Sequence, residues 1–494
     1  MADKNAMKNK SAMRNKSKVK NKDIAKNKAA GKKKYAVDKT MKQEAEKRTA
    51  GKMGKKKYAV DKTVKQEAEK RTIGKMEKKY AVTKAFTEKT DHGKSVKEKK
   101  VSGKNTSEKM ITKKQNADMC QYAKKCGGCD YQGLSYEKQL KEKQEYVRKN
   151  VGKFCKVLPI IGMEHPYHYR NKVHAVVGLD KQKGIVTGTY AEGTHRLVPV
   201  DVCMIEDQKA DSIIATLREL FASFKYVPYN EDTHRGFMRH ILIRRGFSTK
   251  EMMVVLVTAD NKFPSKNNFI KALLEQHPDI TTVVQNINDY STSMVLGKAN
   301  KVLYGKGYIE DVLCGCRFRI SPESFYQINP SQTEKLYKTA IRLGGITKND
   351  VVIDAYCGIG TIGIALSSHA KKVIGVELNP QAVKDAQTNA DLNHIKNIQF
   401  VNEDAGDFLV RYAEGGRADV VIMDPPRSGS TPEFLQSLLQ IKPKRIVYIS
   451  CNPETQVRDV RVLQKGGYKV EKCEGYDMFP HTFHIENVVL MTLK

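Results

Sequence analysis

The chain has 494 residues, ten cysteines, no tryptophan and a formal net charge of +33. No apolar run approaches membrane-spanning length and no hydrophobic signal core opens the chain, so we expect a cytoplasmic protein. In that compartment cysteines serve metal binding or chemistry in preference to a disulfide framework, and the charge predicts a polyanionic partner, most simply nucleic acid.

Residues 1–118 are a separate, strongly basic segment. They carry about 38 lysines and arginines against about 14 acidic residues, roughly +24 of the total charge. A repeated motif, GKKKYAVDKT and its variants, places Tyr35, Tyr58 and Tyr80 about 22 to 23 residues apart. One tyrosine and one valine per repeat bury too little apolar surface to offset chain entropy, so we predict a disordered extension. Two roles fit this composition equally: an arm that binds RNA by counterion release, and a solubilising tail.

A cysteine cluster follows at DMCQYAKKCGGCDYQ, which holds Cys120, Cys126 and Cys129. Three soft ligands in one turn-rich loop suit a tetrahedral metal ion or an iron–sulfur cluster, and a fourth ligand must come from elsewhere. Cys203 is the best candidate for that fourth ligand and Cys155 is its rival. Generic cysteine spacing favours zinc. Unpaired structural cysteines are a weaker explanation for three thiols within ten residues.

The stretch from about 131 to 314 is typical of mixed α/β structure, with strand-like runs at KVHAVVGL, RHILIRRG, EMMVVLVTA and TTVVQNIN. It carries cations and aromatic residues that are candidates for an RNA groove. They are His168, Tyr169, Arg170, Lys172, Arg239, Arg244 and Arg245. For any single one of them, solvated surface charge is the commoner explanation.

From Val351 the pattern changes to regular strand, turn and helix units. The run VVIDAYCGIGTIGIAL predicts a strand, a glycine-rich turn and an apolar helix, and Glu377 closes the next strand at the spacing that suits ribose hydroxyls. Further strands are predicted to end near Asp404, at Asp424 and at Cys451. The turn lacks the tight G-x-G-x-x-G of dinucleotide binders, and Asp-Pro-Pro fixes a carboxylate after the fourth strand. These features favour S-adenosylmethionine over NAD.

Cys451 lies in ISCNPET, at the carboxyl end of a predicted buried strand. A thiolate there can add to C6 of a pyrimidine and so make C5 a nucleophile for a sulfonium methyl group. A base must then remove the C5 proton, and Glu486, at the start of the last strand, is our candidate. An exposed or capping glutamate is the alternative reading of Glu486.

The motifs DPPRSG, IVYISCNPET and HIE resemble those of the RNA uracil-5-methyltransferase family over about residues 119–494. The resemblance implies that Cys451 is the nucleophile and Glu486 the base. In the mechanism that we expect, Asp424 and Arg427 orient the uracil. It also implies cofactor-binding positions, one of them in ESFYQIN: Gln327, Tyr356, Glu377 and Asp424.

The cysteine pattern is similar to that of the branch of this family that acts on 23S ribosomal RNA. This similarity implies a 4Fe-4S cluster, with zinc in second place, held by Cys120, Cys126, Cys129 and Cys203. Many members of that branch begin with a small RNA-binding barrel, the TRAM domain, and no strand pattern for one precedes Cys120. The lysine repeats stand in its place.

We therefore predict an α/β protein with three parts: a disordered extension at 1–118, a central domain at 119–315 and a Rossmann-like class I methyltransferase domain at 316–494. The expected activity is methylation of uracil C5 in 23S ribosomal RNA by a protein that is monomeric. Alternatives are the same reaction on transfer RNA, cytosine-5 methylation, and a non-catalytic RNA-binding ribosome-assembly factor. The remaining cysteines are expected to be small buried apolar residues: Cys155, Cys314, Cys316, Cys357 and Cys473.

Overall fold

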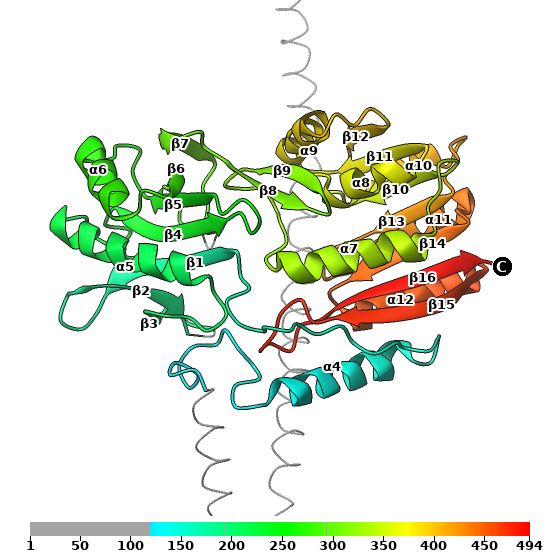
Figure 1. The fold of residues 1–494 in the computed structure, drawn as a ribbon, viewed down its shortest axis with the longest axis horizontal. Coiled ribbons are helices and arrows are strands. Elements are labelled where there is room, and N and C mark those ends of the chain that lie inside the picture. The colour runs from blue at the N-terminus through cyan, green and yellow to red at the C-terminus, as the bar shows by residue number, and fades with distance from the viewer. Residues whose placement is uncertain (1–118, 192, 293) are drawn as a thin grey trace, which may run out of the picture. The chain divides into compact units, whose positions relative to one another are not determined.

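A computed structural model describes residues 119–191, 193–292 and 294–494. The prediction of a disordered extension at 1–118 lies outside these residues. Within the described ranges, no helix is long and apolar enough to cross a membrane. The strands form two seven-stranded sheets and one two-stranded sheet (Figure 1), so the α/β prediction is confirmed.

The first sheet has the order β3-β2-β1-β4-β5-β6-β7. Only β5 and β6 pair in parallel. The strands are β1 (Lys172–Leu179), β2 (Ile185–Tyr190), β3 (Leu197–Pro199), β4 (Met238–Arg245), β5 (Met252–Thr258), β6 (Ile280–Ile287) and β7 (Ala299–Gly305). The four strands expected from sequence are β1, β4, β5 and β6, with ends within one residue of the predicted runs.

Helices α5 (Gln208–Ser223) and α6 (Lys266–Gln276) pack on one face of this sheet around Phe221 and Phe269. All seven residues of β5 are buried, which agrees with its unbroken apolar run, because such a strand needs cover on both faces. The opposite face joins a second core that includes the hairpin of β8 (Ile309–Leu313) and β9 (Cys316–Ile320).

The second sheet has the order β12-β11-β10-β13-β14-β16-β15. The first five of these strands are parallel: β10 (Val351–Ala355), β11 (Lys372–Glu377), β12 (Ile398–Asn402), β13 (Val420–Met423) and β14 (Arg445–Ser450). The last two, β15 (Tyr468–Tyr476) and β16 (Glu486–Leu493), run antiparallel at one edge. The order reverses between β10 and β13, where open α/β sheets bind ligands at the carboxyl ends of their strands.

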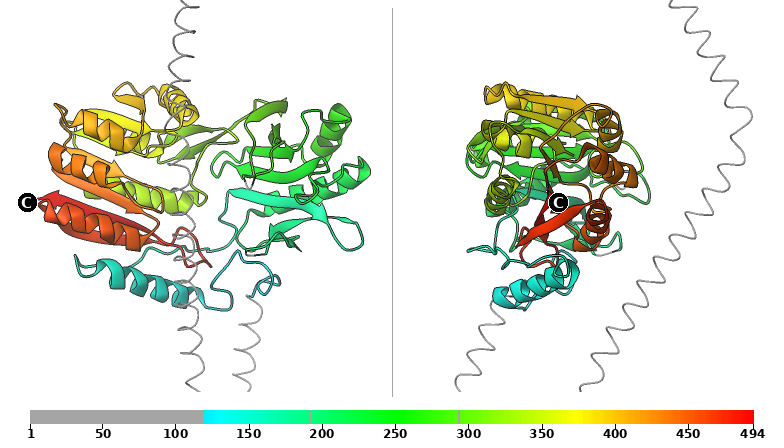
Figure 2. Two further views of the ribbon diagram at one scale, coloured as in Figure 1. Left: turned by 180° about the vertical axis from the view of Figure 1, so that it is seen from behind. Right: turned by 90° about the vertical axis from the view of Figure 1, so that its right-hand side faces the viewer.

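Helices cover both faces of this sheet (Figures 1 and 2). On one face lie α7 (Pro330–Gly344), α8 (Thr361–Leu366) with the short 3-10 helix η2 (Ser367–His369), and α9 (Pro380–Leu392). On the other lie α4 (Tyr136–Val151), α10 (Ala405–Tyr412), α11 (Pro432–Ile441) and α12 (Pro453–Lys465). Alternate strand residues feed the two cores: Val352 of β10 packs on the first face and Ile353 on the second.

Three helices begin with the same Asn-Pro pair. Asn329, Asn379 and Asn452 each accept a backbone N–H of the first helical turn through the side chain, and proline follows as the first helical residue. At Asn452 this leaves Cys451 alone between the end of β14 and the cap of α12. The Cys451 thiol is therefore held between the last residue of β14 and the cap residue of α12.

Candidate active site and thiol-lined cavity

Three strand ends bring the predicted nucleophile and base together. Cys451 follows β14, Asp424 follows the neighbouring parallel strand β13, and Glu486 begins β16. Because β16 is antiparallel to β14, its first residues lie beside the last residues of β14, with Ser450 opposite Asn487. The antiparallel turn-back at the sheet edge therefore brings a residue 35 positions further along the chain next to the thiol.

The loop after Asp424 is attached to the loop that carries the thiol. The Arg427 carbonyl accepts hydrogen bonds from Asn452 Nδ2 at 3.3 Å and from Thr455 Oγ1 at 3.1 Å. The exposed Arg427 guanidinium reaches His484, with Nη2 3.1 Å from His484 Nε2. A cation is thus held beside Cys451 by contacts to two other loops.

The charges around Cys451 oppose one another. The pKa of its thiol is raised to about 11, first by burial and then by the carboxylates of Glu486 and Asp424, while the charge and hydrogen bond of Arg427 lower it. Burial also raises the pKa of Asp424, and the pKa of Glu486 is raised by burial and by Asp424. Glu486 is only 5% exposed, and its Oε2 has no hydrogen-bond partner among the described residues. The free protein therefore holds a neutral thiol beside carboxyl groups that readily take up a proton.

The glycine-rich turn after β10 leaves room for a ligand. Tyr356 and Gly358 both have left-handed backbones, with φ of 65° and 56°, and a Cβ at Gly358 would meet no atom within 4 Å. The Glu377 carboxylate accepts the backbone N–H of Gly358 at 3.1 Å and that of Asn379 at 2.8 Å. Tyr356 packs its ring on Phe434 with 5.4 Å between centroids. An open glycine and an acidic strand end fit a nucleoside with ribose hydroxyls.

Gln327 differs from the other predicted cofactor residues. It lies in the segment between β9 and α7, and its recorded contact is made by the backbone carbonyl, which accepts Asn171 Nδ2 at 3.2 Å. The structure thus ties this segment to the first sheet, and among the described residues the Gln327 side chain makes no hydrogen bond to Tyr356, Glu377 or Asp424.

The four cysteines predicted to share a ligand line one cavity of about 420 Å³. Cys120, Cys126 and Cys129 come from the loop before α4, and Cys203 from the segment before α5. Burial raises the pKa of Cys129, and the neighbouring thiols of Cys126 and Cys120 raise it further. Burial, Glu206 and Cys129 raise the pKa of Cys203 to about 12. Cys203 therefore lines the same cavity as the other three cysteines.

Cys155 does not line this cavity and packs in the core near Cys473. The expectation of buried cysteines is confirmed for Cys357 and Cys473, whereas Cys155, Cys314 and Cys316 are half-buried at core margins. Cys155, the rival candidate for the fourth ligand, therefore lies away from the thiol-lined cavity.

The cavity suits a sulfur-rich anionic group in its chemistry. Arg170 and His174 also line it, and their buried Nε and Nε2 atoms have no hydrogen-bond partner within the described ranges. Such nitrogens can donate to the sulfurs of a cluster. Among the described residues, however, the structure contains no group of three or more His, Cys, Asp or Glu side chains that could hold a metal ion. The thiols share a cavity without converging on one point.

Three candidates for the RNA groove are buried, so neither an RNA-groove role nor solvated surface charge describes them. Arg239 is 2% exposed, pairs with Glu231 at 2.7 Å and donates to the carbonyl of Asn288 at 2.8 Å. Arg244 is buried and donates to the carbonyl of Ser324. Tyr169 is buried as well. These side chains bind backbone inside the protein because a buried cation or hydroxyl needs partners, which composition alone cannot reveal.

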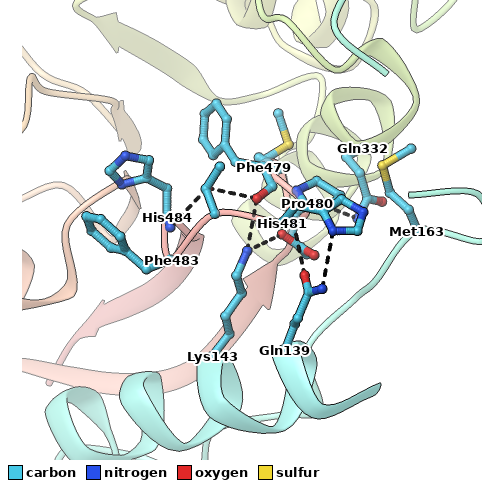
Figure 3. Close-up of polar contacts among 12 residues, drawn as sticks. Gln139, Lys143, Met163, Gln332, Phe479, Pro480, His481, Phe483 and His484 are labelled. Carbon is cyan, nitrogen blue, oxygen red and sulfur yellow. Dashed lines mark hydrogen bonds and ion pairs between the residues drawn. The ribbon is translucent and has the colours of Figure 1, made fainter. Parts of the chain in front are cut away.

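One functional feature was missed by the sequence reasoning: a polar network that joins α4 to the loop before Glu486 (Figure 3). Lys143 and Gln139 of α4 point from the helix toward Phe479 and His481. A signal was present, since the buried face of α4 carries Gln139, Lys143, Val147 and Val151 at intervals of four residues. A lysine on an otherwise inward-facing stripe needs a buried partner.

Comparison with known proteins adds a consistent set of relatives. Residues 135–494 match the family model described as tRNA (Uracil-5-)-methyltransferase. An uncharacterized RNA methyltransferase of Oceanobacillus iheyensis is 44% identical over 376 residues, which cover 75% of this chain and 82% of the relative. An uncharacterized RNA methyltransferase of Halalkalibacterium halodurans is 43% identical over 381 residues, which cover 76% of this chain and 83% of the relative.

Among solved structures, the fold is similar to that of the Pyrococcus abyssi tRNA (uracil-54, C5)-methyltransferase in complex with S-adenosyl-L-homocysteine. The TM-score is 0.63 at 28% identity, over 74% of this chain and 86% of the other.

Proposed function

The chain belongs to the tRNA (uracil-5-)-methyltransferase family, and on that premise we propose that it methylates C5 of a uracil in 23S ribosomal RNA through a covalent bond to Cys451. It is an RNA methyltransferase that depends on S-adenosylmethionine. The observation that carries the covalent route is the meeting of Cys451, Asp424 and Glu486 at one edge of the second sheet. A non-catalytic binding factor would need neither a buried base nor a thiol between charged groups.

The thiol acts first. Cys451 loses its proton to solvent with help from Arg427, and the thiolate adds to C6 so that the C5–C6 electron pair becomes available at C5. When bound, S-adenosylmethionine would supply the methyl group as a sulfonium: the C5 electron pair forms the new C–C bond, the S–CH3 bond breaks, and the neutral thioether S-adenosylhomocysteine leaves. C5 now carries both the methyl group and its original proton.

Glu486 completes the reaction. Its carboxylate takes the C5 proton, the C5–C6 double bond re-forms, and Cys451 leaves C6 as a thiolate. One proton is released to solvent for each methyl group transferred. Since Glu486 is buried and one of its oxygens has no partner among the described residues, that oxygen is available to receive the proton. The uracil must leave its stack to reach this site, and Asp424 and Arg427 orient it.

We assign cofactor binding to Gln327, Tyr356, Glu377 and Asp424. The open space at Gly358 and the carboxylate of Glu377 support this assignment on the ribose side. Asp424 lies between the cofactor edge of the sheet and Cys451, which suits a residue that contacts both reactants.

The thiol-lined cavity is assigned to a 4Fe-4S cluster held by Cys120, Cys126, Cys129 and Cys203, with zinc as the alternative. The assignment is supported by the four thiols that line one cavity and by the buried nitrogens of Arg170 and His174 in its wall. Its role is to hold the local fold. Anaerobically purified protein should contain iron and absorb visible light, and a Cys126→Ser variant should lose both together with stability. A folded, colourless and fully active variant would refute the structural role, and unaltered protein without iron would refute the cluster itself.

Transfer RNA is the second candidate substrate, because both the family description and the Pyrococcus abyssi relative name it. The cysteine pattern, similar to that of the ribosomal-RNA branch, favours 23S ribosomal RNA.

A trapping experiment tests chemistry and substrate together. Purified protein is incubated with S-adenosylmethionine and 5-fluorouracil-substituted RNA, and products are analysed by mass spectrometry beside a Cys451→Ala variant. Fluorine at C5 cannot leave as a proton, so a covalent complex should accumulate with 23S ribosomal RNA fragments, map to Cys451 and be absent in the variant. A complex with transfer RNA alone would change the substrate, and no complex with either would overturn the covalent mechanism.

A further inference from the structure

The loop of residues 477–485 joins β15 to β16 and ends directly at Glu486. The loop therefore fixes the approach to the proposed base from its amino-terminal side, and Glu486 itself pairs with Tyr476 of β15. Several segments hold this loop. Two of them lie near the start of the described chain: helix α4, and Asp130 and Tyr131 at the end of the cysteine loop. Further hydrogen bonds come from Tyr169, Asn329 and Gln332.

Helix α4 holds the start of the loop with a buried ion pair (Figure 3). Lys143 Nζ lies 2.6 Å from Asp477 Oδ1, and the two side chains are 1% and 0% exposed. Lys143 also donates to the Phe479 carbonyl at 3.1 Å, and Tyr136 donates its hydroxyl to Asp477 Oδ2 at 2.8 Å. A buried ion pair adds little net stability, because desolvation offsets the attraction. Its distinctive contribution here is a fixed geometry.

The middle of the loop is held in a conformation that it would not adopt freely. His481 has a left-handed backbone with φ of 68° although it is not glycine. Its N–H donates to Gln139 Oε1 at 3.0 Å, and its ring stacks on Tyr167 with 4.8 Å between centroids. Side chains from outside the loop thus maintain this conformation.

The cysteine loop holds the same residue from the other side. The backbone N–H groups of Asp130 and Tyr131 both donate to the His481 carbonyl at 3.0 Å. The Asp130 carboxylate in turn accepts the N–H of Phe483 at 3.0 Å. Asp130 directly follows Cys129, so these three bonds connect the wall of the thiol-lined cavity to the residues just before His484 and Glu486.

We propose that Lys143 and Asp130 are positioning residues for the final step of the reaction: they fix loop 477–485 so that Glu486 meets the C5 proton. The inference rests on the proposed uracil chemistry. It implies that the group bound by Cys129 restrains the base through Asp130, since both residues belong to one short segment.

The test separates positioning from simple loss of structure. If Glu486 is displaced, Cys451 still adds to C6 and C5 still receives its methyl group, but removal of the C5 proton slows. The variants Lys143→Met and Asp130→Asn should therefore accumulate covalent protein–RNA complex on ordinary, unfluorinated substrate. Their kcat should fall by roughly 10- to 100-fold with little change in KM, as expected for a misplacement of about 1 Å.

Matched controls are exposed residues of the same type that make no contact with loop 477–485 in the hydrogen bonds and ion pairs of the described chain. Lys141→Met changes an exposed lysine one half-turn away on α4, and Asp289→Asn changes an exposed aspartate of the central region. Both should behave as the unaltered protein. Since Lys143→Met leaves Asp477 buried without its cation and can unfold the protein, the exposed Asp130 provides the deciding variant.

Two results would overturn the inference: Asp130→Asn kinetics equal to those of its control, or reduced turnover without accumulated complex. The unaltered protein with 5-fluorouracil RNA runs alongside, because absence of its complex would reject the uracil chemistry itself. Hydrogen exchange adds a readout independent of activity: removing the metal should increase exchange at residues 477–485 in the full chain. Unchanged exchange there would refute the link from Cys129 to the base.

Discussion

The buried carboxyl group of Asp354 predicts an unusual dependence of stability on pH. Asp354 lies in β10 at 1% exposure, where Oδ2 accepts the Gly363 N–H at 2.7 Å and Oδ1 has no partner within the described ranges. Burial raises its pKa from an ordinary value of 3.8 to about 7, Asp424 and Glu377 add to the shift, and the Gly363 N–H opposes it. The folded protein therefore keeps a proton that the unfolded chain loses near pH 4.

The sign and size of the effect follow from this difference. A raised carboxyl pKa favours the folded state below the unfolded pKa, and this advantage is lost as pH rises toward 7. A shift of about three units corresponds to about 4 kcal/mol at pH 8 and less than about 1 kcal/mol at pH 4. Asp354→Asn keeps an acceptor for Gly363 and never ionises. We expect the variant to be more stable than the unaltered protein by about 2–4 kcal/mol at pH 8, with near-equality at pH 4.

Urea unfolding at pH 4, 6 and 8, with the slope compared between the two proteins, measures this difference. Because every other carboxyl group is shared, subtraction isolates Asp354. A stability difference that does not change with pH, or a variant less stable at pH 8, would refute the reasoning.

Two further predictions concern the thiol and the cavity wall. Arg427→Gln should raise the pKa of Cys451 above about 11, because it removes the cation that lowers this pKa. Alkylation of Cys451 at pH 9, followed by mass spectrometry, should slow by at least about threefold. The exposed control Arg461→Gln should leave this rate unchanged. Gly188→Ala should lower the free energy of unfolding by about 1–3 kcal/mol, because the added Cβ would lie 1.9 Å from the Val198 carbonyl oxygen. The control is Gly415→Ala, where an added Cβ meets no atom within 4 Å. Equal urea midpoints of the two variants would contradict the expectation.

Much of the local structure was predictable because it is encoded over short distances. The apolar runs of β1, β4, β5 and β6 are continuous enough to indicate strands, and the Asn-Pro pair after Cys451 marks a helix start. The division at residues 118 and 315 remains a prediction. Strand β15 was not predicted, although it carries the turn-back that leads to Glu486.

Side chains with long-range partners were the least predictable. Nothing adjacent in sequence distinguishes Arg239, which is buried against Glu231, from a solvated arginine. Similarly, Lys143 finds Asp477 334 positions later in the chain. Burial of a charge is tolerated only where the fold supplies its partner, so the outcome depends on the folded arrangement and not on the residue type.

By itself, the sequence indicated which groups are candidates for chemistry: the Cys451 thiol between a strand and a capped helix, the glycine turn, and four cysteines proposed to share one group. The tertiary structure decided which of them meet. An antiparallel final strand brings Glu486 to Cys451, and the fold places Cys203, not Cys155, at the thiol-lined cavity. The reason is physical: reactivity follows from residue type and local backbone, whereas proximity between distant residues follows from how the sheets pair and which charges they bury.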